Sequence, residues 1–439
     1  MIAPAYQQAL DYLYSFVDFS QVRLGRDSIK RFDLARMHAL AASLGDPQKQ
    51  YPILHVAGTK GKGSVAALCA SALQAAGLQT GLYISPHLVD FCERIQIDGQ
   101  PISQATLIGL VEAIKPHLAA ISGVTLFEIT TALGMWHFAR AGVQAAVMEV
   151  GLGGRLDATN IVQPAVTVIT SLSYDHVAML GDTLPQIAAE KGGIIKPGVP
   201  VVLAPQVDEA RQVLKQIAAE RQAPVVEVGK DIRFEAGEHS LDGQTFRVAG
   251  VDSSWQELSL SLLGRHQIEN AATAYAALGV WQAHGLPVRE DAIRRGFAAV
   301  RWPCRFEILQ RRPPLVVDSA HNRDSARRLL QAVDDYFPGR PVVLLFGSSE
   351  DKDIAGMFDE LLPRVRNVIF TRSLHPRAAQ PERLAEQARP YGVALEQVSR
   401  VEDALPAALR LAGDDALVLA AGSLFVAAAV REVWRETQG

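Results

Sequence analysis

The sequence predicts an α/β protein with two doubly wound domains, a larger one over residues 1–300 and a smaller one over residues 301–439. Its 439 residues exceed the size of one typical core. Short apolar runs alternate with longer helical patterns, and this alternation restarts once, after a Pro-containing stretch at residues 301–304. Fully apolar strands between helices are typical of parallel sheets that are covered on both faces.

The first domain contains five apolar runs that we expect to form its parallel sheet. They occupy residues 53–57, 80–84, 145–150, 166–170 and 199–203. Between residues 231 and 263, polar and apolar side chains alternate around an Asp242-Gly243 turn, which predicts a small antiparallel sheet. Two helical patterns over residues 268–283 and 289–299 end the domain.

The second domain repeats the strand-helix alternation on a smaller scale. Its expected strands occupy residues 315–317, 342–346, 368–370 and 416–420, and a helical pattern follows each of them. The order is typical of a Rossmann-like domain. The phosphate turn described below has no counterpart in it.

Composition excludes several classes of partner. Charged residues make up 21% of the chain, and 43 Lys and Arg against 47 Asp and Glu give a net charge of −4. Neither a nucleic acid nor an anionic membrane is therefore an expected partner. No apolar run reaches the roughly 18 residues of a membrane helix, and the first residues lack the basic start of a signal peptide. Three sparse cysteines, Cys69, Cys92 and Cys304, indicate reduced thiols. We expect a cytoplasmic protein.

A glycine-rich turn directly after the first apolar run carries the strongest chemical signal. Residues 58–64 read Gly-Thr-Lys-Gly-Lys-Gly-Ser, and a helical pattern follows. Glycines allow backbone N–H groups to converge on phosphate oxygens, while Lys62 and Ser64 can serve the γ-phosphate and Mg²⁺. The spacing differs from the usual Walker A motif because Gly63 separates Lys62 from Ser64. The turn predicts a P-loop ATPase-like domain, and the alternative is an ordinary strand-to-helix turn.

Three polar residues follow neighbouring apolar runs, where parallel sheets bind their ligands. They are Ser85, Glu149 and His176. A carboxylate at the end of an apolar run is costly to bury unless a cation or donor meets it, so Glu149 is the best candidate. Together the three side chains could bind Mg²⁺. Taken singly, Ser85 could be a turn residue before Pro86, and His176 a structural histidine.

Lys191 and the segment 318–322 offer further chemistry. Lys191 stands beside two glycines and apolar residues. Partial burial would lower its pKa and leave the neutral amine that carbamylation by CO₂ requires. A solvated lysine at a helix end fits the spacing equally well. In the second domain, Asp318 and His321 follow a strand, and Asn322 or Asp324 could cap the next helix.

Together these segments resemble the folylpolyglutamate synthase and dihydrofolate synthase family, within the larger group of Mur-type ATP-dependent amide ligases. The resemblance extends over nearly the whole chain. Its marks, in chain order, are Gly58 to Ser64, Ser85-Pro86-His87-Leu88, residues 127–132 (Phe-Glu-Ile-Thr-Thr-Ala), residues 149–160 (Glu-Val-Gly-Leu-Gly-Gly-Arg-Leu-Asp-Ala-Thr-Asn), Asp175-His176, Glu190-Lys191, residues 266–272 (His-Gln-Ile-Glu-Asn-Ala-Ala), Arg305-Phe306-Glu307 and Asp318 to Asn322.

The resemblance implies an enzyme that phosphorylates a folate or dihydropteroate carboxylate with ATP and Mg²⁺, and then forms an amide with L-glutamate. It implies a monomer that acts on small molecules. The ATP-binding residues would be Gly58, Thr59, Lys60, Gly61, Lys62, Gly63, Ser64, Asn270, Arg305 and Asp318, and the metal ligands Ser85, Glu149 and His176. The catalytic residues would be Lys62, Lys191 and His321, with Lys191 N-carbamylated. The folate or pterin site would include Thr125, Leu126, Phe127, Glu128, Leu156, Asp157 and Ala158.

Some positions depart from the family pattern. The family often has Asn at Lys60 and Gly at both Cys304 and Ser319. Residues 23–27 match the pterin-binding loop of bifunctional members only loosely, which leaves the use of dihydropteroate open. Two other readings remain. One is a ligase for nucleotide-linked cell-wall precursors, although such enzymes commonly carry a separate domain before the phosphate turn. The other is a nucleotide-dependent switch module without catalysis.

Overall fold

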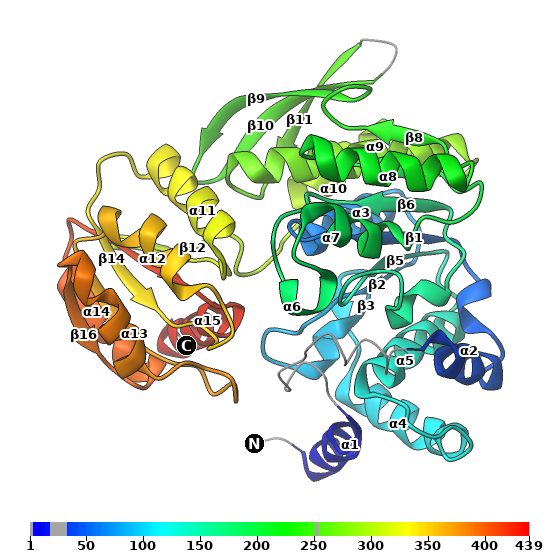
Figure 1. The fold of residues 1–439 in the computed structure, drawn as a ribbon, viewed down its shortest axis with the longest axis horizontal. Helices are drawn as coiled ribbons and strands as arrows, with labels where there is room; N and C mark the ends of the chain where they lie inside the picture. The colour runs from blue at the N-terminus through cyan, green and yellow to red at the C-terminus, as the bar shows by residue number, and fades with distance from the viewer. Residues whose placement is uncertain (1–2, 18–32, 251–253, 439) are drawn as a thin grey trace. The chain divides into compact units, whose positions relative to one another are not determined.

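The computed structural model describes residues 3–17, 33–250 and 254–438, so the segment 23–27 lies outside the described residues. The chain forms two compact units, each with its own sheet (Figure 1). Unit 1 comprises residues 1–236, 246–260 and 268–300. Unit 2 comprises residues 237–245, 261–267 and 301–439. The predicted α/β fold class is confirmed, because each unit has a mainly parallel sheet with helices packed on it.

The sheet of unit 1 has the strand order β4-β3-β2-β5-β1-β6-β7-β8. The strands are β1 Ile53–Ala57, β2 Thr80–Tyr83, β3 Ile95–Ile97, β4 Gln100–Pro101, β5 Ala145–Glu149, β6 Val166–Ile169, β7 Val201–Leu203 and β8 Val225–Glu227. Strands from β2 to β8 in this order pair in parallel, whereas β3 is antiparallel to β2 and β4. The strand β1, which leads into the phosphate turn, therefore lies inside the sheet with both edges paired.

Helices surround this sheet. They are α1 Pro4–Tyr14, α2 Leu34–Ser43, α3 Lys62–Ala75, α4 Gln104–Leu118, α5 Leu126–Ala141, α6 Val177–Leu180, α7 Leu184–Gly192, α8 Asp208–Glu220, α9 Arg265–Ala283 and α10 Glu290–Ala299, with short 3₁₀ turns η2 Pro47–Lys49, η3 Phe91–Arg94 and η4 Ala158–Ile161. Ile53 packs into the core cluster of α4 and α5, and Ala57 into that of α7 and α8. Alternate residues of a strand share a face, so these helices cover one face of the sheet. The helix α3 contacts β1, β2 and β5, and α10 packs against α3.

The predicted small antiparallel sheet is present as β9 Arg233–Ser240, β10 Gly243–Ala249 and β11 Trp255–Leu260, in the order β11-β10-β9. Two boundaries differ from the prediction by more than one residue. The expected strand 199–203 begins at Val201, because Val199 still bonds to Lys196 in a turn. The helix expected from residue 268 begins three residues earlier, at Arg265.

The sheet of unit 2 has the order β12-β13-β17-β14-β15-β16, and only β12 runs antiparallel to its neighbour. Its strands are β12 Glu307–Arg311, β13 Pro314–Val317, β14 Val342–Phe346, β15 Asn367–Phe370, β16 Ala394–Gln397 and β17 Leu417–Ala421. Its helices are α11 Arg323–Tyr336, α12 Ile354–Leu361, α13 Pro381–Ala388, α14 Val401–Ala412 and α15 Leu424–Gln438, with 3₁₀ turns η5 Leu362–Arg364 and η6 Arg389–Tyr391. Asn322 is the N-cap of α11, which confirms one of the two predicted caps.

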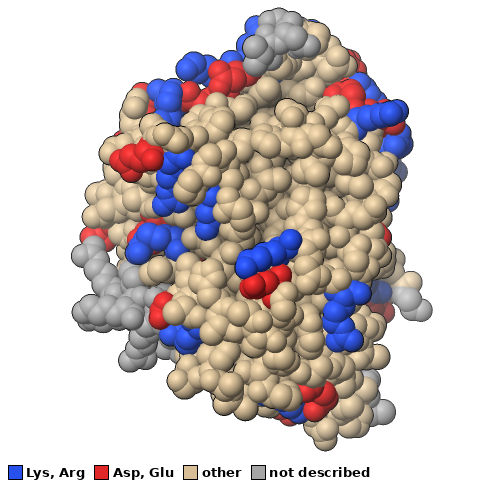
Figure 2. All heavy atoms as spheres, turned by 90° about the vertical axis from the view of Figure 1, so that its right-hand side faces the viewer, with Lys and Arg blue, Asp and Glu red and all other residues tan. Residues whose placement is uncertain are grey.

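The charge distribution on the surface and the state of the cysteines agree with what the composition predicted. On the face drawn in Figure 2, positive and negative side chains are interspersed and most of the surface is uncharged. Cys69, Cys92 and Cys304 are free and buried. Across the three described ranges, no helix has both the length and the apolarity needed to cross a membrane.

The contact between α3 and α10 depends on Gly296. A Cβ atom at this position would lie 2.5 Å from the Cα of Ala72. Gly296→Ala should therefore lower the free energy of unfolding by about 1–3 kcal/mol, since the backbones must separate. Urea denaturation measures this. The control is Gly279→Ala on α9, where a Cβ meets nothing within 4 Å. It should be neutral or stabilising by up to about 1 kcal/mol, and equal destabilisation by both changes would contradict this account.

Candidate active site

The phosphate turn connects β1 to α3, and two of its glycines are required by the space around them. Gly58 has a φ of 148°, and a Cβ there would lie 1.8 Å from Thr170 Oγ1. Gly61 has a φ of 86°, and its Cβ would lie 2.1 Å from Asn270 Oδ1. The second contact places Asn270, a predicted nucleotide residue, directly beside the turn. Any other residue type would displace these side chains and would adopt a backbone conformation that is rare for L residues.

The backbone donors of the turn are not all free to bind a ligand. The amides of Thr59 and Lys60 both donate to the carbonyl oxygen of Ser171, at 3.1 and 3.0 Å. The helix α3 begins at Lys62, and the N–H groups of its first turn have no partner within a helix. An anion at the turn would therefore be bound by the start of α3 and by its dipole.

Three predicted residues meet beside the turn. Glu149 ends β5, and its side chain is 7% exposed. Its Oε1 lies 4.0 Å from Lys62 Nζ, and its Oε2 accepts the backbone N–H of Ser85 at 3.4 Å. Ser85 follows β2, the neighbour of β5 in the sheet. The buried carboxylate is thus met by a cation and a donor, as its position in the sequence required.

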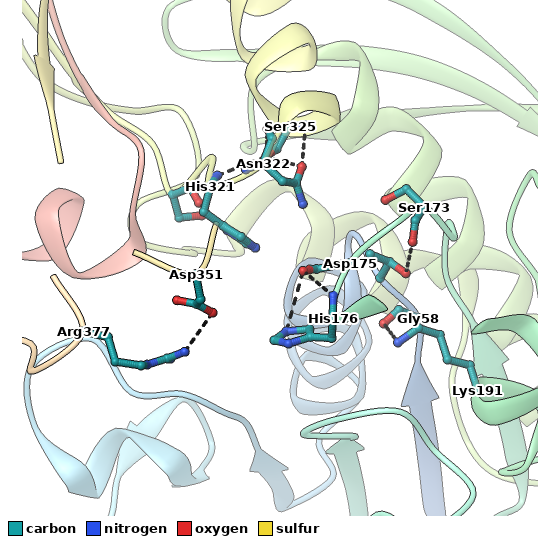
Figure 3. Close-up of polar contacts among 12 residues, drawn as sticks. Gly58, Ser173, Asp175, His176, Lys191, His321, Asn322, Ser325, Asp351 and Arg377 are labelled. Atoms are coloured by element: carbon teal, nitrogen blue, oxygen red, sulfur yellow. Dashed lines mark hydrogen bonds and ion pairs between the residues drawn. The ribbon is translucent and has the colours of Figure 1, made fainter. Parts of the chain in front are cut away.

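Lys191 lies in the last turn of α7 and is only 5% exposed. Its Nζ donates to the carbonyl oxygen of Gly58 at 2.9 Å, as Figure 3 shows. Burial, reinforced by the positive charges of Lys62 and Lys60, lowers the pKa of Lys191 from 10.5 to about 7, and Asp175 and Asp157 oppose this shift. The structure therefore favours the buried amine over the solvated lysine that spacing alone allowed.

His176 precedes the short helix α6 and has a φ of 50°. Its Nε2 lies 3.8 Å from Asp175 Oδ1, and its side chain is 42% exposed. The backbone carbonyl of the nearby Ser173 accepts the hydroxyl of Thr59 at 3.2 Å, which ties this loop to the phosphate turn (Figure 3). Asp175, which was not among the predicted site residues, also influences the charge of Lys191.

The two segments expected at the folate site lie close together, because the helix α5 contacts the turn η4, whose N-cap is Asp157. The ring of Phe127 occupies the space where a Cβ of Gly151 would be, at 2.4 Å. Thr125 and Glu128 form a capping box at the start of α5, and Glu128 also pairs with Arg36 at 3.2 Å. Leu126 and Ala158 are buried in the core cluster that also contains Ile53 and residues of α4 and α5. Asp157 is 6% exposed and is the N-cap of η4, while the preceding Leu156 remains partly exposed.

In unit 2, Asp318 follows β13 and connects two loops. Its Oδ2 accepts the N–H of Phe306, and its Oδ1 accepts that of Ala320, both at 2.7 Å. Burial raises the pKa of Asp318, and the neighbouring Arg305 and these backbone donors oppose the rise. Arg305 donates to Ser319 Oγ and to the carbonyl of Cys304. Asp318, Arg305 and Ser319 therefore form one cluster.

His321 and Cys304 complete the predicted residues of this unit. His321 Nδ1 lies 2.9 Å from the carbonyl oxygen of Ser319, which can only accept, so Nδ1 carries the proton. Cys304 has a φ of 57°, in the left-handed region that favours glycine. This is a position where the family often has Gly, and here the cysteine itself adopts the left-handed conformation.

Sequence reasoning missed a group of buried serines at the carboxyl ends of β14, β15 and β17. They are Ser348, Ser349, Ser373 and Ser423, each at most 9% exposed. Arg377 pairs with Asp351 at 3.0 Å near the same edge (Figure 3). Each of these serines follows an apolar run within three residues, so a search for polar residues shortly after every run would have selected them.

Comparison with known proteins identifies the class. Residues 56–278 match the Mur ligase middle domain, and residues 304–424 match the Mur ligase glutamate ligase domain. The fold and both matches define a Mur-type ligase. The dihydrofolate synthase/folylpolyglutamate synthase of Bacillus subtilis is 34% identical over 98% of this chain and 99% of that protein. The folylpolyglutamate synthase of Lacticaseibacillus casei is 35% identical over 97% and 98%.

Solved structures of related enzymes resemble this chain over nearly its full length. The folylpolyglutamate synthase of Mycobacterium tuberculosis complexed with ADP has a TM-score of 0.88 at 33% identity, covering 98% of both chains. The E. coli FolC complex with DHPP and ADP has a TM-score of 0.87 at 32% identity, covering 100% and 99%. The chain belongs to the folylpolyglutamate synthase and dihydrofolate synthase family, and it is an ATP-dependent glutamate ligase.

The buried amine of Lys191 predicts a pH-dependent stability. Unfolded Lys191 keeps its proton up to pH 10.5, whereas the folded form releases it near pH 7. The unfolded state binds more protons in this window, so the unfolding free energy of the wild type should rise from about pH 7 towards pH 10.5. Each unit of pKa shift corresponds to about 1.4 kcal/mol. Lys191→Met should lack this rise.

Urea denaturation between pH 6 and pH 10 in CO₂-free buffer measures the effect. The free energy of unfolding of Lys191→Met should exceed that of the wild type most below pH 7, and this difference should decrease as pH increases. Lys49→Met, at a lysine that is 70% exposed, is the control. A parallel pH dependence in the wild type and Lys191→Met would show that this amine is not held neutral.

Proposed function

We propose that the chain joins L-glutamate to the carboxylate of a folate through an acyl phosphate made with ATP. The observation that carries this proposal is the convergence of Lys62, Glu149 and Lys191 on the phosphate turn. The γ-phosphoryl group moves to the folate carboxylate. The amine of glutamate then attacks the acyl carbon, phosphate leaves, and the amine gives up a proton. Both steps increase negative charge, which positioned cations stabilise.

The phosphate-binding residues have separate tasks. The start of α3, from Gly61 through Gly63 to Ser64, donates backbone N–H groups to phosphate oxygens. Lys62 neutralises charge on the γ-phosphate, and Lys60 adds a second positive charge at the turn. The carbonyls of Gly58 and Ser171 orient the turn through their partners Lys191, Thr59 and Lys60.

The nucleotide site also uses Asn270, Arg305 and Asp318. Asn270 is supported by its position beside Gly61. The roles of Arg305 and Asp318 rest on the family resemblance, and the cluster they form gives the guanidinium a fixed direction. His321, which carries its proton on Nδ1, is the third proposed catalytic residue, and this role rests on the family resemblance.

Mg²⁺ fits the donors at this site. Among the described residues, no group of three or more His, Cys, Asp and Glu side chains forms a metal site by itself. Mg²⁺ commonly takes one or two protein carboxylates and completes its shell with phosphate and water. Glu149, Ser85 and His176 are the proposed protein ligands. When bound beside these residues, the ion would neutralise part of the negative charge on the phosphate groups.

Lys191 is the proposed site of carbamylation. Its amine is buried and has a pKa of about 7, so a large fraction is neutral at physiological pH. A neutral amine can add CO₂ and lose a proton, which converts a cationic side chain into an anion. This anion would lie among Lys60 and Lys62, which oppose the protonated amine.

The acceptor site is proposed at segments 125–128 and 156–158. Phe127 offers an aromatic ring beside Gly151, and Glu128 and Asp157 offer carboxylates that could receive the N–H groups of a pterin. The relatives carry both dihydrofolate synthase and folylpolyglutamate synthase names, so dihydropteroate is the second proposed acceptor. We expect a cytoplasmic monomer that binds no nucleic acid or membrane.

Incorporation of labelled glutamate, with tetrahydrofolate or dihydropteroate as the acceptor, tests the proposal. Product should require ATP and Mg²⁺, with one phosphate released for each amide formed. Glu149→Gln should lower kcat/KM at least about 100-fold, because the carboxylate that meets the cation is lost. Gly279→Ala serves as a folded control. No incorporation by a folded wild type that binds ATP would contradict the proposal, and product with tetrahydrofolate alone would restrict it to polyglutamate synthesis.

Carbamylation of Lys191 has its own test. Protein equilibrated with ¹³C-bicarbonate at pH 8 should show a carbamate carbon signal by NMR that is absent in Lys191→Met. The signal should weaken below about pH 7, because protonation of the amine blocks the addition of CO₂. Lys49→Met should keep the signal. An equal signal in Lys191→Met would place the carbamate elsewhere.

A further inference from the structure

A buried histidine lies inside the sheet, before the phosphate turn. His55 is the middle residue of β1 and is 0% exposed. Burial, together with the charge of Lys196, lowers its pKa to about 3, so the ring is neutral at physiological pH. The other residues of β1 are apolar, and the strand itself requires no polar side chain here.

The ring makes one polar contact, and its direction can be assigned. His55 Nε2 lies 2.8 Å from Thr159 Oγ1, and that hydroxyl donates to Asp157 Oδ1 at 2.6 Å. A hydroxyl has one hydrogen, so Thr159 must accept from His55, whose Nε2 carries the proton. Nδ1 is then an acceptor, and in the described part of the chain it has no hydrogen-bond partner.

These two hydrogen bonds lead from His55 through Thr159 to the carboxylate of Asp157, which has several other partners. Asp157 Oδ1 also accepts the N–H of Thr159 at 3.0 Å, and Oδ2 accepts that of Leu152 at 2.9 Å. These contacts fold the segment 151–160 around the carboxylate. His55 therefore connects the strand that leads into the phosphate turn to the segment that carries Asp157.

The far side of the same segment is also fixed. The side-chain Nδ2 of Asn160 donates to the backbone carbonyl of Arg155 at 2.9 Å. The backbone carbonyl of Asn160 accepts Lys196 Nζ at 2.7 Å. The Arg155 amide donates to the Glu190 carbonyl at 2.8 Å. A Cβ on Gly154 would lie 2.8 Å from the carbonyl oxygen of Lys191. The segment is thus held between β1 and the end of α7.

We infer that His55 is a positioning residue for the acceptor: through Thr159 it orients the Asp157 carboxylate and so determines the affinity for the pterin ring without contacting it. A leucine in β1 would satisfy the core without an unpartnered buried acceptor. The polar ring therefore lowers the free energy of unfolding relative to leucine. Its link to Thr159 and Asp157 gives a reason for a histidine at this position. The inference rests on the proposed function, because it takes segment 156–158 as part of the folate site.

The test compares two pairs of variants in the full-length protein. His55→Leu and Thr159→Val remove the chain of donors, while His55→Gln and Thr159→Ser keep a donor and a hydroxyl. Loss of a hydrogen bond to a charged group should raise the dissociation constants for tetrahydrofolate or dihydropteroate, and the acceptor KM, by about tenfold or more. KM for ATP should change less than about twofold. The conservative variants should recover most of the affinity.

A matched control lies beside His55. Thr167 of β6 is its partner across the strands, is 0% exposed, and has a hydroxyl with no hydrogen-bond partner among the described residues. Thr167→Val should leave acceptor affinity unchanged. If His55→Leu does not fold, Thr159→Val against Thr159→Ser carries the test.

The outcomes separate this inference from the proposed function. A wild type that binds neither acceptor would overturn both. If the wild type binds an acceptor, unchanged affinity in Thr159→Val would overturn only the positioning role. Equal increases in KM for ATP and for the acceptor would do the same, because they would indicate a general structural defect.

Discussion

The hydrogen bond from Lys191 to the carbonyl oxygen of Gly58 is the interaction on which the site depends. It joins the end of α7 to the phosphate turn and holds an amine where water is excluded. Beside it, Lys62 and Lys60 disfavour a third positive charge. The amine loses its proton readily because it is buried beside these cations, whereas the buried carboxylate of Glu149 is compensated by the positive charge of Lys62.

The fold allows this arrangement through the direction of its strands. In a parallel sheet the carboxyl ends of neighbouring strands meet at one edge, so residues far apart in the chain become neighbours. Gly58, Ser85 and Glu149 follow or end β1, β2 and β5. The two hydrogen bonds that connect His55 through Thr159 to Asp157 add a link from the middle of β1 to the segment that borders α7.

Much of this could be predicted from the sequence, because buried parallel strands are continuous apolar runs and glycine-rich turns are local. The strands β3, β4, β8 and β16, which lie at or next to a sheet edge, could not be predicted, since they are short or half-exposed and have no long apolar run. Burial of Lys191 also could not, because spacing does not distinguish a buried helix end from a solvated one. The contact between His55 and Thr159 joins residues 104 positions apart, and local pattern gives no signal for it.

The central claim is that the edge of the sheet around Gly58 and Lys191 is a preorganised triphosphate site. A crystal structure with Mg²⁺ and a non-hydrolysable ATP analogue tests it most directly. Phosphate oxygens should lie on the backbone N–H groups at the start of α3, with Lys62 at the terminal phosphate and the metal ion bound to Glu149. A triphosphate bound away from residues 58–64, or a metal ion that does not contact Glu149, would contradict it.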